Sequence, residues 1–282
     1  MTLATLTPIP VPEPPRGWAG RARWALADAW TITLRAFAHW ARKLDELLIG
    51  LLFPVMMVLI MGYLFGGQMK VPGGGNYREF IMPGMFAMTM VFGVEATFAA
   101  IANDTAKGVT DRFRAMPMAP SAVVAGRCVA DMINSLVSLV VMVGCGLLIG
   151  WKWHEGAGKA VVAFGLLLLL RFSLLWMGAY LGLVAKGPES IMAVQILVWP
   201  ISFLSSALIA PSTMPGWLGV IAEWNPMSAT ATATRDLFGN PGLTSTGSWA
   251  GDHSLLLAVL WPLVIIAVFL PLSVRRYRNL AR

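Results

Sequence analysis

The chain has 282 residues, of which 57% are hydrophobic and only 12% are charged, and its mean hydropathy is +0.70. Soluble domains carry about 25% charged residues, so this composition excludes an ordinary soluble fold and indicates a membrane protein with several spans. The net charge of +7 comes from scattered Lys and Arg, without the basic run of a nucleic-acid-binding segment, so no nucleic-acid partner is expected.

The N-terminal part of the chain is polar. Residues 1–17 hold five prolines after Thr7 and lack the apolar core of a signal peptide, which predicts a disordered tail ahead of a single membrane domain, residues 18–282. Residues 18–46 follow as an amphipathic helix, with Leu26, Trp30 and Leu34 on one face and basic residues on the other. We expect this helix to lie along the inner membrane interface; a helix of a small soluble subdomain is the alternative.

Six apolar segments follow and predict an all-α membrane fold with six transmembrane helices. Such segments suit the ~30 Å hydrocarbon core. Their approximate ranges are 47–65, 80–102, 129–150, 160–185, 191–210 and 255–272.

The distribution of basic residues predicts the orientation. With both termini in the cytoplasm, the inner segments hold 15 of the 21 Lys and Arg residues and the outer segments hold five. Cytoplasmic loops are enriched in Lys and Arg, so this arrangement is favoured over its inverse. It places residues 103–121 in the cytoplasm and residues 211–240 outside.

Residues 211–240 do not read as an ordinary loop. Trp217, Ile221 and Trp224 form a short apolar face at helical spacing, and Asn225-Pro226 then breaks the helix. We expect two short re-entrant helices that dip into the outer leaflet, with their tryptophans at the interface.

Glu95 and Arg171 are the charges that we place inside the membrane. Each is costly in lipid and must face the bundle interior, water or a partner. The two side chains could pair with each other, contact a polar group on a substrate, snorkel, or lie at a subunit interface. No grouping of Cys, His or carboxylates predicts a metal site.

Residues 103–121 are a charged interruption between two apolar segments. A magnesium-diphosphate site of a membrane transferase needs several carboxylates on one face, but the residue three after Asp104 is Lys107. The chain also has no GxxxxGK[ST] motif, so it has no P-loop of its own. A solvated loop is the plain alternative to a docking segment.

Three stretches resemble the permease subunits of ABC type-2 exporters, above all the actinobacterial daunorubicin-resistance-type permeases. The resemblance covers about residues 20–280, and its last stretch is the most specific. The stretches are Asp104-x3-Gly108-x3-Arg112-x4-Pro117 running on to Gly126-Arg127, then Met82-Pro83-Gly84, and Met214-Pro215-Gly216-Trp217-Leu218 with Glu223-Trp224-Asn225-Pro226.

The resemblance implies two permease copies, expected as a homodimer, and two separate ATP-binding subunits that hold the ATP and magnesium. This chain itself is then expected to bind no cofactor and to be no enzyme. The resemblance also implies an interfacial connecting helix at 18–46 and a coupling helix at about 104–118, although Thr105-Ala106 depart from the usual charged pattern. Pro117 and Pro120 are expected to end the coupling helix before the third span. The ATPase-coupling residues are Asp104, Lys107, Gly108, Asp111, Arg112, Arg114 and Pro117.

The predicted function is export of a hydrophobic or amphiphilic drug, antibiotic or lipid-like molecule across a bacterial plasma membrane. We expect a substrate path between two permease copies, lined by the second and fifth spans; plain core or lipid packing is the alternative for each residue. A membrane-embedded transferase lacks a catalytic constellation here, and an ion-coupled transporter would show inverted repeats. The path residues are Met88, Met90, Phe92, Glu95, Phe98, Gln195 and Trp199.

Overall fold

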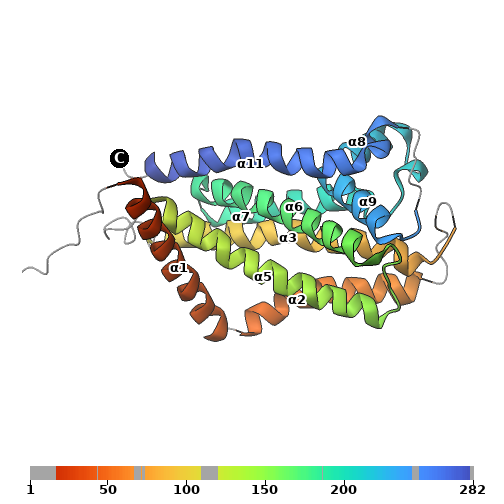
Figure 1. Ribbon diagram of the computed structural model, residues 1–282, viewed down its shortest axis with the longest axis horizontal. Coiled ribbons are helices and arrows are strands. Elements are labelled where there is room, and N and C mark those ends of the chain that lie inside the picture. Colours follow the sequence, from red (N-terminus) through yellow and green to blue (C-terminus); the bar gives the residue numbers. More distant parts are fainter. Residues whose placement is uncertain are drawn as a thin grey trace, which may run out of the picture.

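The computed structural model describes residues 17–42, 44–66, 71, 74–108, 120–185, 187–242 and 248–279, and all regular structure within these ranges is helical (Figure 1). Of the predicted Pro-rich tail, only Gly17 belongs to the described residues. In chain order the elements are α1 (Trp18–Arg42), α2 (Leu44–Leu59) continuing into a π-helical turn (Ile60–Phe65), α3 (Tyr77–Ala106), α5 (Pro120–Leu148), α6 (Gly156–Val184), α7 (Pro188–Phe203), a 3-10 turn (Pro211–Thr213), α8 (Gly216–Trp224), α9 (Pro226–Phe238), α10 (Trp249–Asp252) and α11 (Ser254–Asn279).

Four of these helices contain segments long and apolar enough to cross a membrane. The segments are Tyr77–Ala106, Ala125–Leu148, Gly156–Val184 and Ser254–Tyr277. Two further apolar helices, Gly50–Phe65 and Glu189–Phe203, are shorter. The prediction of an all-α membrane fold is therefore confirmed, and the six predicted segments divide into four long helices and two short ones.

Pro120 is the first residue of α5, the position at which proline's missing N–H costs nothing. The expected end of the coupling helix before it lies outside the described residues. One predicted helix boundary was wrong. α7 ends at Phe203 rather than near residue 210. Serine side chains and Asn225 bind the backbone groups beyond Phe203, as described below, and this competes with continuation of the helix.

α3 lies at the centre of the bundle, packed against α5, α6, α7 and α9. At the end of the bundle near α9, an aromatic cluster closes the core. Trp151 lies 5.0 Å from Phe86 and 5.1 Å from Phe238 between ring centroids, and its indole Nε1 donates to Asn240 Oδ1 at 2.8 Å. A buried tryptophan with a satisfied N–H combines a large apolar contact with a fixed orientation.

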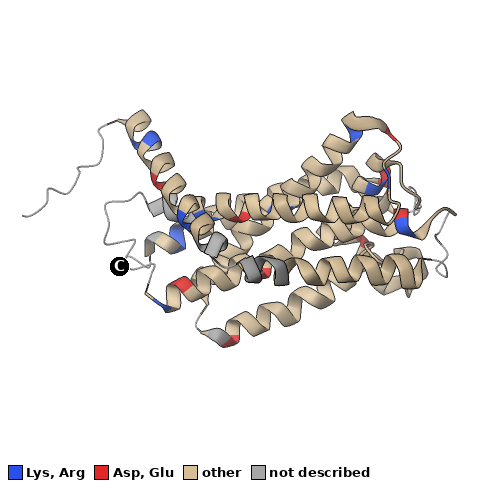
Figure 2. Cartoon of the chain, turned by 90° about the horizontal axis from the view of Figure 1, so that it is seen from below, with Lys and Arg blue, Asp and Glu red and all other residues tan. Residues whose placement is uncertain are grey.

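α1 presents two different faces. Ile32, Thr33 and Ala36 are buried, and Thr33 Oγ1 donates to Gly126 O of α5 at 3.0 Å. The predicted apolar stripe of Leu26 and Trp30 is exposed, pointing away from the rest of the chain. α1 and the end of α11 lie at one end of the bundle and α8 and α9 at the other (Figure 1). Most charged residues gather towards these two ends (Figure 2).

Candidate functional site

The end of α3 carries the first residues of the predicted coupling segment. Asp104 lies in the last turn of α3, and Lys107 is the C-cap residue whose N–H donates to Asn103 O at 3.0 Å. Gly108 follows with φ +66, a left-handed conformation that commonly ends helices. α3 therefore runs into the segment. The other predicted coupling residues, Asp111, Arg112, Arg114 and Pro117, lie outside the described residues.

Arg171 is buried at the junction of α3, α5 and α6, with only 2% of its surface exposed. Its Nε donates to Ser135 Oγ of α5 at 2.6 Å, and its Nη2 donates to Thr97 Oγ1 of α3 at 3.0 Å. One guanidinium thus joins three helices, which is possible because Arg offers several donors in a fixed planar arrangement.

A second charge in this junction was missed from sequence. Asp131 of α5 is buried, and its Oδ1 lies 3.1 Å from Nε of Arg127, one helical turn earlier. Asp131 Oδ2 and Arg171 Nη1 are both buried and lack a hydrogen-bond partner among the described residues. The signal was present as the i, i+4 spacing of Arg127, Asp131 and Ser135, since these positions share one helix face. We call Thr97, Arg127, Asp131, Ser135 and Arg171 the polar junction.

The structure separates Glu95 from Arg171, so the two intramembrane charges do not pair. A Cβ atom at Gly93 would lie 2.6 Å from Arg171 Cζ, and Thr97 binds the guanidinium, so this face of α3 meets α6. Glu95 is two residues from both, about 200° around the helix. Its carboxyl instead interacts with the side chain of Gln195 on α7.

Four of the seven predicted path residues come together where α3 packs against α7. The ring centroids of Phe92 and Trp199 are 5.1 Å apart. Glu95 and Gln195 lie about one turn from these rings on the same two helices, and Gln195 and Trp199 are exposed on the outer face of the chain. The second and fifth spans, which were predicted to line the path, thus meet through a defined set of side chains.

Two residues that the sequence did not single out extend this cluster. Phe53 of α2 lies 4.8 Å from Trp199 and 5.8 Å from Phe92, and Phe203 stacks on Trp199 at 6.0 Å. Phe53, Trp199 and Phe203 keep 36–42% of their surface exposed. Nothing in the sequence distinguished Phe53 and Phe203 from other apolar residues of membrane helices. We call Phe53, Phe92, Trp199 and Phe203 the aromatic face.

The remaining three predicted path residues lie elsewhere. Met88 and Met90 belong to the main hydrophobic core and are fully buried, and Phe98 is 2% exposed. Because other helices surround α3, these side chains pack within one chain and are not on the outer face that carries Trp199. Their placement corresponds to the core-packing alternative.

Beyond Phe203, residues 204–210 form a non-helical segment that we call the α7 break. Asn225 holds its start: Nδ2 donates to Ile201 O and to Leu204 O, both at 2.8 Å. Oδ1 of the same side chain accepts from Met227 N at 2.9 Å and caps α9. One amide therefore closes the C-terminal end of α7 and the N-terminal end of α9, which explains the Asn-Pro pair in the most specific family-like stretch.

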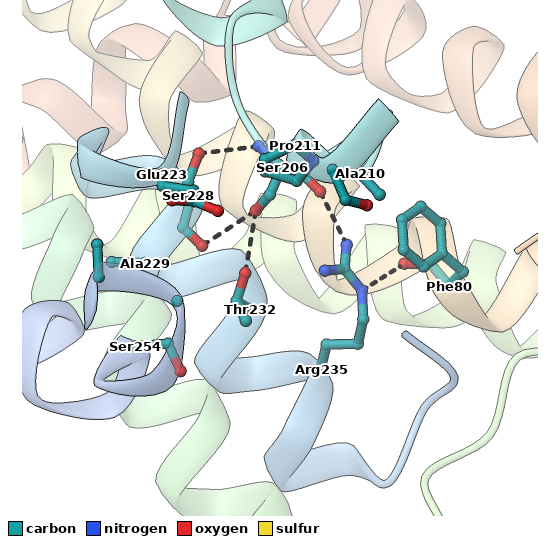
Figure 3. A pocket seen from close by; sticks show the side chains of 13 residues that line it. Phe80, Ser206, Ala210, Pro211, Glu223, Ser228, Ala229, Thr232, Arg235 and Ser254 are labelled. Atoms are coloured by element: carbon teal, nitrogen blue, oxygen red, sulfur yellow. Dashed lines mark hydrogen bonds between the residues drawn. The ribbon is translucent and has the colours of Figure 1, made fainter. Parts of the chain in front are cut away.

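Arg235 of α9 holds the other side of the α7 break. Its Nη2 donates to Ser206 O at 3.1 Å and its Nε to Phe80 O at 3.0 Å, while the guanidinium lies 4.1 Å from the centroid of the Phe80 ring. Ser206 also bonds to Ser228 and Thr232 (Figure 3). The adjoining cavity has a volume of about 30 Å³, room for a water molecule rather than a substrate.

Gly84 explains the Met82-Pro83-Gly84 stretch. A Cβ atom at this position would lie 2.3 Å from the carbonyl oxygen of Ala207 and 2.6 Å from its Cα. The backbone of α3 therefore touches the backbone of the α7 break directly, an approach that only glycine permits. Two of the family-like stretches thus contact the same segment: Gly84 meets the α7 break at Ala207, and Asn225 binds it at Leu204.

Replacing Asn225 with alanine is expected to lower the free energy of unfolding by about 2–3 kcal/mol, because an N-cap and the two hydrogen bonds to Ile201 and Leu204 are lost. The measurement is the temperature at which the detergent-purified protein loses its monodisperse size-exclusion peak. Asn225→Asp is the matched variant: it keeps the cap acceptor but loses the two N–H donors. A wild-type midpoint for Asn225→Asp would show that the bonds to Ile201 and Leu204 contribute nothing.

Comparison with known proteins gives the class of this membrane protein. Residues 27–238 match the family described as ABC-2 type transporter. The chain belongs to this family, so it is the membrane permease component of an ABC-2 type exporter.

Individual relatives are similar in sequence to this chain over most of their length. The chain is 36% identical over 247 residues, 87% of this chain and 83% of the relative, to the daunorubicin resistance ABC transporter permease protein DrrB1 of Streptomyces coeruleorubidus. It is 23% identical, over 81% of this chain and 83% of the relative, to the probable doxorubicin resistance ABC transporter permease protein DrrC of Mycobacterium tuberculosis. It is 24% identical, over 82% and 78%, to the putative transport permease ycf38 of Cyanophora paradoxa.

Three predictions from sequence are confirmed by these matches. The chain is a multi-pass membrane permease of the resembled family, it works with an ATP-binding subunit, and as a permease subunit it is not itself an enzyme.

Proposed function

We propose that this chain is one of two identical permease subunits of an exporter that moves a drug, antibiotic or lipid-like amphiphile out of a bacterial cell across its plasma membrane. Two ATP-binding subunits supply the energy. The observation that carries this proposal is the match of residues 27–238 to the ABC-2 type transporter family. The daunorubicin and doxorubicin named for two relatives support a drug-like substrate.

The proposed topology has six spans with both termini in the cytoplasm. α2 with its π-helical turn and α7 supply the two shorter spans, α1 lies in the inner interface, and α8 and α9 dip into the outer leaflet. The position of α1 and the end of α11 at the same end of the bundle supports this arrangement (Figure 1). So does the exposure of Leu26 and Trp30 on α1 and of Trp217 and Trp224 on α8.

ATP-driven movement reaches this chain through residues 103–121, the segment to which we propose that the ATP-binding subunit docks. α3 and α5 flank this segment, and both contribute side chains to the polar junction. A shift of the segment would therefore reach Arg171 through two helices that already contact it, which is how packed elements switch between discrete arrangements. ATP and magnesium stay in the partner, and this chain binds no cofactor.

The substrate path runs along the aromatic face, between the two permease copies. α2 and α7 expose apolar side chains beside that face, among them Leu52, Met192 and Ile196. In the assembled exporter these side chains meet the second copy or lipid. Met88, Met90 and Phe98 do not line this path; they are buried in the core of the same chain.

Purification after co-expression with the ATP-binding subunit tests the coupling assignment. We expect the ATP-binding subunit to co-purify with the wild-type permease. The double change Arg112→Glu and Arg114→Glu is expected to reduce its recovery at least tenfold, because reversing both charges turns attraction at the docking surface into repulsion. Arg275→Glu, an exposed arginine near the end of α11, is the matched control. Unchanged recovery with both arginines reversed would place the docking site elsewhere.

A further inference from the structure

We propose that Glu95 is the residue by which the aromatic face selects positively charged, aromatic substrates. This inference rests on the proposed export function and adds to it the residue that recognises the charge of the substrate. It comes from three observations on the described residues. The Glu95 carboxyl has no cation as a partner, the nearby buried arginine binds other groups, and an exposed aromatic cluster lies on the same two helices.

The Glu95 carboxyl lacks a charge partner within the part of the chain that the structure describes. Its Oε1 is buried and has no hydrogen-bond partner there, and its interaction with Gln195 is with a neutral amide. A carboxylate inside a membrane protein is costly unless it is paired or protonated. Such a group is therefore ready to accept a cation that arrives from outside the chain.

The internal cations nearby are already in use. Arg171, which the sequence offered as one possible partner, donates to Thr97 on the opposite side of α3 and to Ser135 of α5. Arg127 pairs with Asp131 in the same junction. The fold thus commits Arg171 and Arg127 to other partners and leaves the Glu95 carboxyl facing Gln195 of α7.

The aromatic face supplies the second part of the recognition. Phe92 lies three residues before Glu95 on α3, and Trp199 lies four residues after Gln195 on α7, so the two rings lie about one turn from the two members of the Glu95–Gln195 pair. Phe53 and Phe203 extend the ring surface, and three of its four rings are more than one third exposed. Aromatic rings bind flat apolar groups and are attracted to cations over their faces.

These features define the class of ligand. An aromatic cation fits, since its rings pack against the aromatic face while its charge meets Glu95. An anion of the same shape would place two like charges together in a low-dielectric site, and a neutral ligand would leave the carboxylate unpaired. Gln195 can accept or donate to polar groups of either kind, so it orients without selecting charge.

The experiment measures equilibrium binding of two probes of the same shape and opposite charge, tetraphenylphosphonium and tetraphenylborate, to the purified permease complex with its ATP-binding subunit. The wild type is expected to bind the cation at least tenfold more tightly than the anion. Glu95→Gln is expected to weaken cation binding at least tenfold and to narrow or remove this preference. Trp199→Ala is expected to weaken both probes.

Glu155→Gln is the matched control. Glu155 is exposed, and its hydrogen bond to Lys159 at 2.7 Å lowers its pKa, so the control removes a charged carboxylate of the same kind away from the aromatic face. Wild-type cation affinity in a folded Glu95→Gln complex would overturn the proposal, as would equal affinity of the wild type for both probes. Because these readouts need no transport, they are separate from a failure of ATP-dependent export or of subunit association, which would count against the proposed function.

Discussion

Replacing Arg171 with methionine is expected to destabilise the bundle by about 3–5 kcal/mol, the cost of removing one member of a buried polar network. Thr97 and Ser135 would lose their shared donor, and the buried Asp131 would lose a nearby positive charge. The volume of the side chain changes little, so the loss reports the charge and its hydrogen bonds. The measurements are the thermal midpoint of the purified protein and the yield of folded protein.

Adding Asp131→Asn to Arg171→Met should recover part of this loss, because the uncompensated carboxylate is then gone. Such recovery is the sign of coupling within the polar junction. Lys159→Met is the control in the same helix, since Lys159 is exposed and pairs with Glu155 at the surface. If Arg171→Met is no worse than Lys159→Met, the junction does not hold the three helices together.

Replacing Gly84 with valine is expected to prevent correct folding. A Cβ atom there meets backbone atoms of Ala207 at 2.3–2.7 Å, and backbone cannot rotate aside as a flexible side chain does. Overpacking a core costs about 1–3 kcal/mol when side chains can adjust, so a clash with backbone should cost more. The expected result is little or no monodisperse protein, measured by size exclusion at equal expression.

Gly165→Val is the control for this prediction. Gly165 lies within α6, is exposed, and has no neighbouring atom within 4 Å of the position that a Cβ atom would take, so valine there changes helix propensity without a clash. Its yield should stay near that of the wild type. A Gly84→Val protein that folds as well as Gly165→Val would mean that α3 and the α7 break are further apart than the structure places them.

The family-like stretches were visible in sequence, but their physical meaning was not. Asn225-Pro226 was recognised as a helix break, which local chemistry predicts. That Asn225 reaches back to Ile201 and Leu204 depends on a contact between segments more than 20 residues apart. Gly84 likewise has a reason only once Ala207 lies against it.

The charges inside the membrane were assigned incompletely from sequence. Asp131 fell inside a predicted span and was passed over, although its spacing from Arg127 marked a shared face. Pairing of Glu95 with Arg171 was one of four alternatives that the sequence left open. A position within a membrane span does not fix the direction of a side chain: the two-residue offset of Glu95 from Gly93 and Thr97 turns it towards α7 while Arg171 meets the other face.

By itself, the sequence determined the membrane class, the all-helical fold, the approximate apolar segments and the permease family, because composition, hydrophobic run length and local motifs carry these properties. Only the tertiary structure decided that Arg171 binds α3 and α5, that Met88, Met90 and Phe98 are core, and that Glu95 meets Gln195 of α7. Those outcomes depend on which helix faces meet. Rotation and packing of one helix against another are set by contacts between residues far apart in the chain, which periodicity within a single segment does not encode.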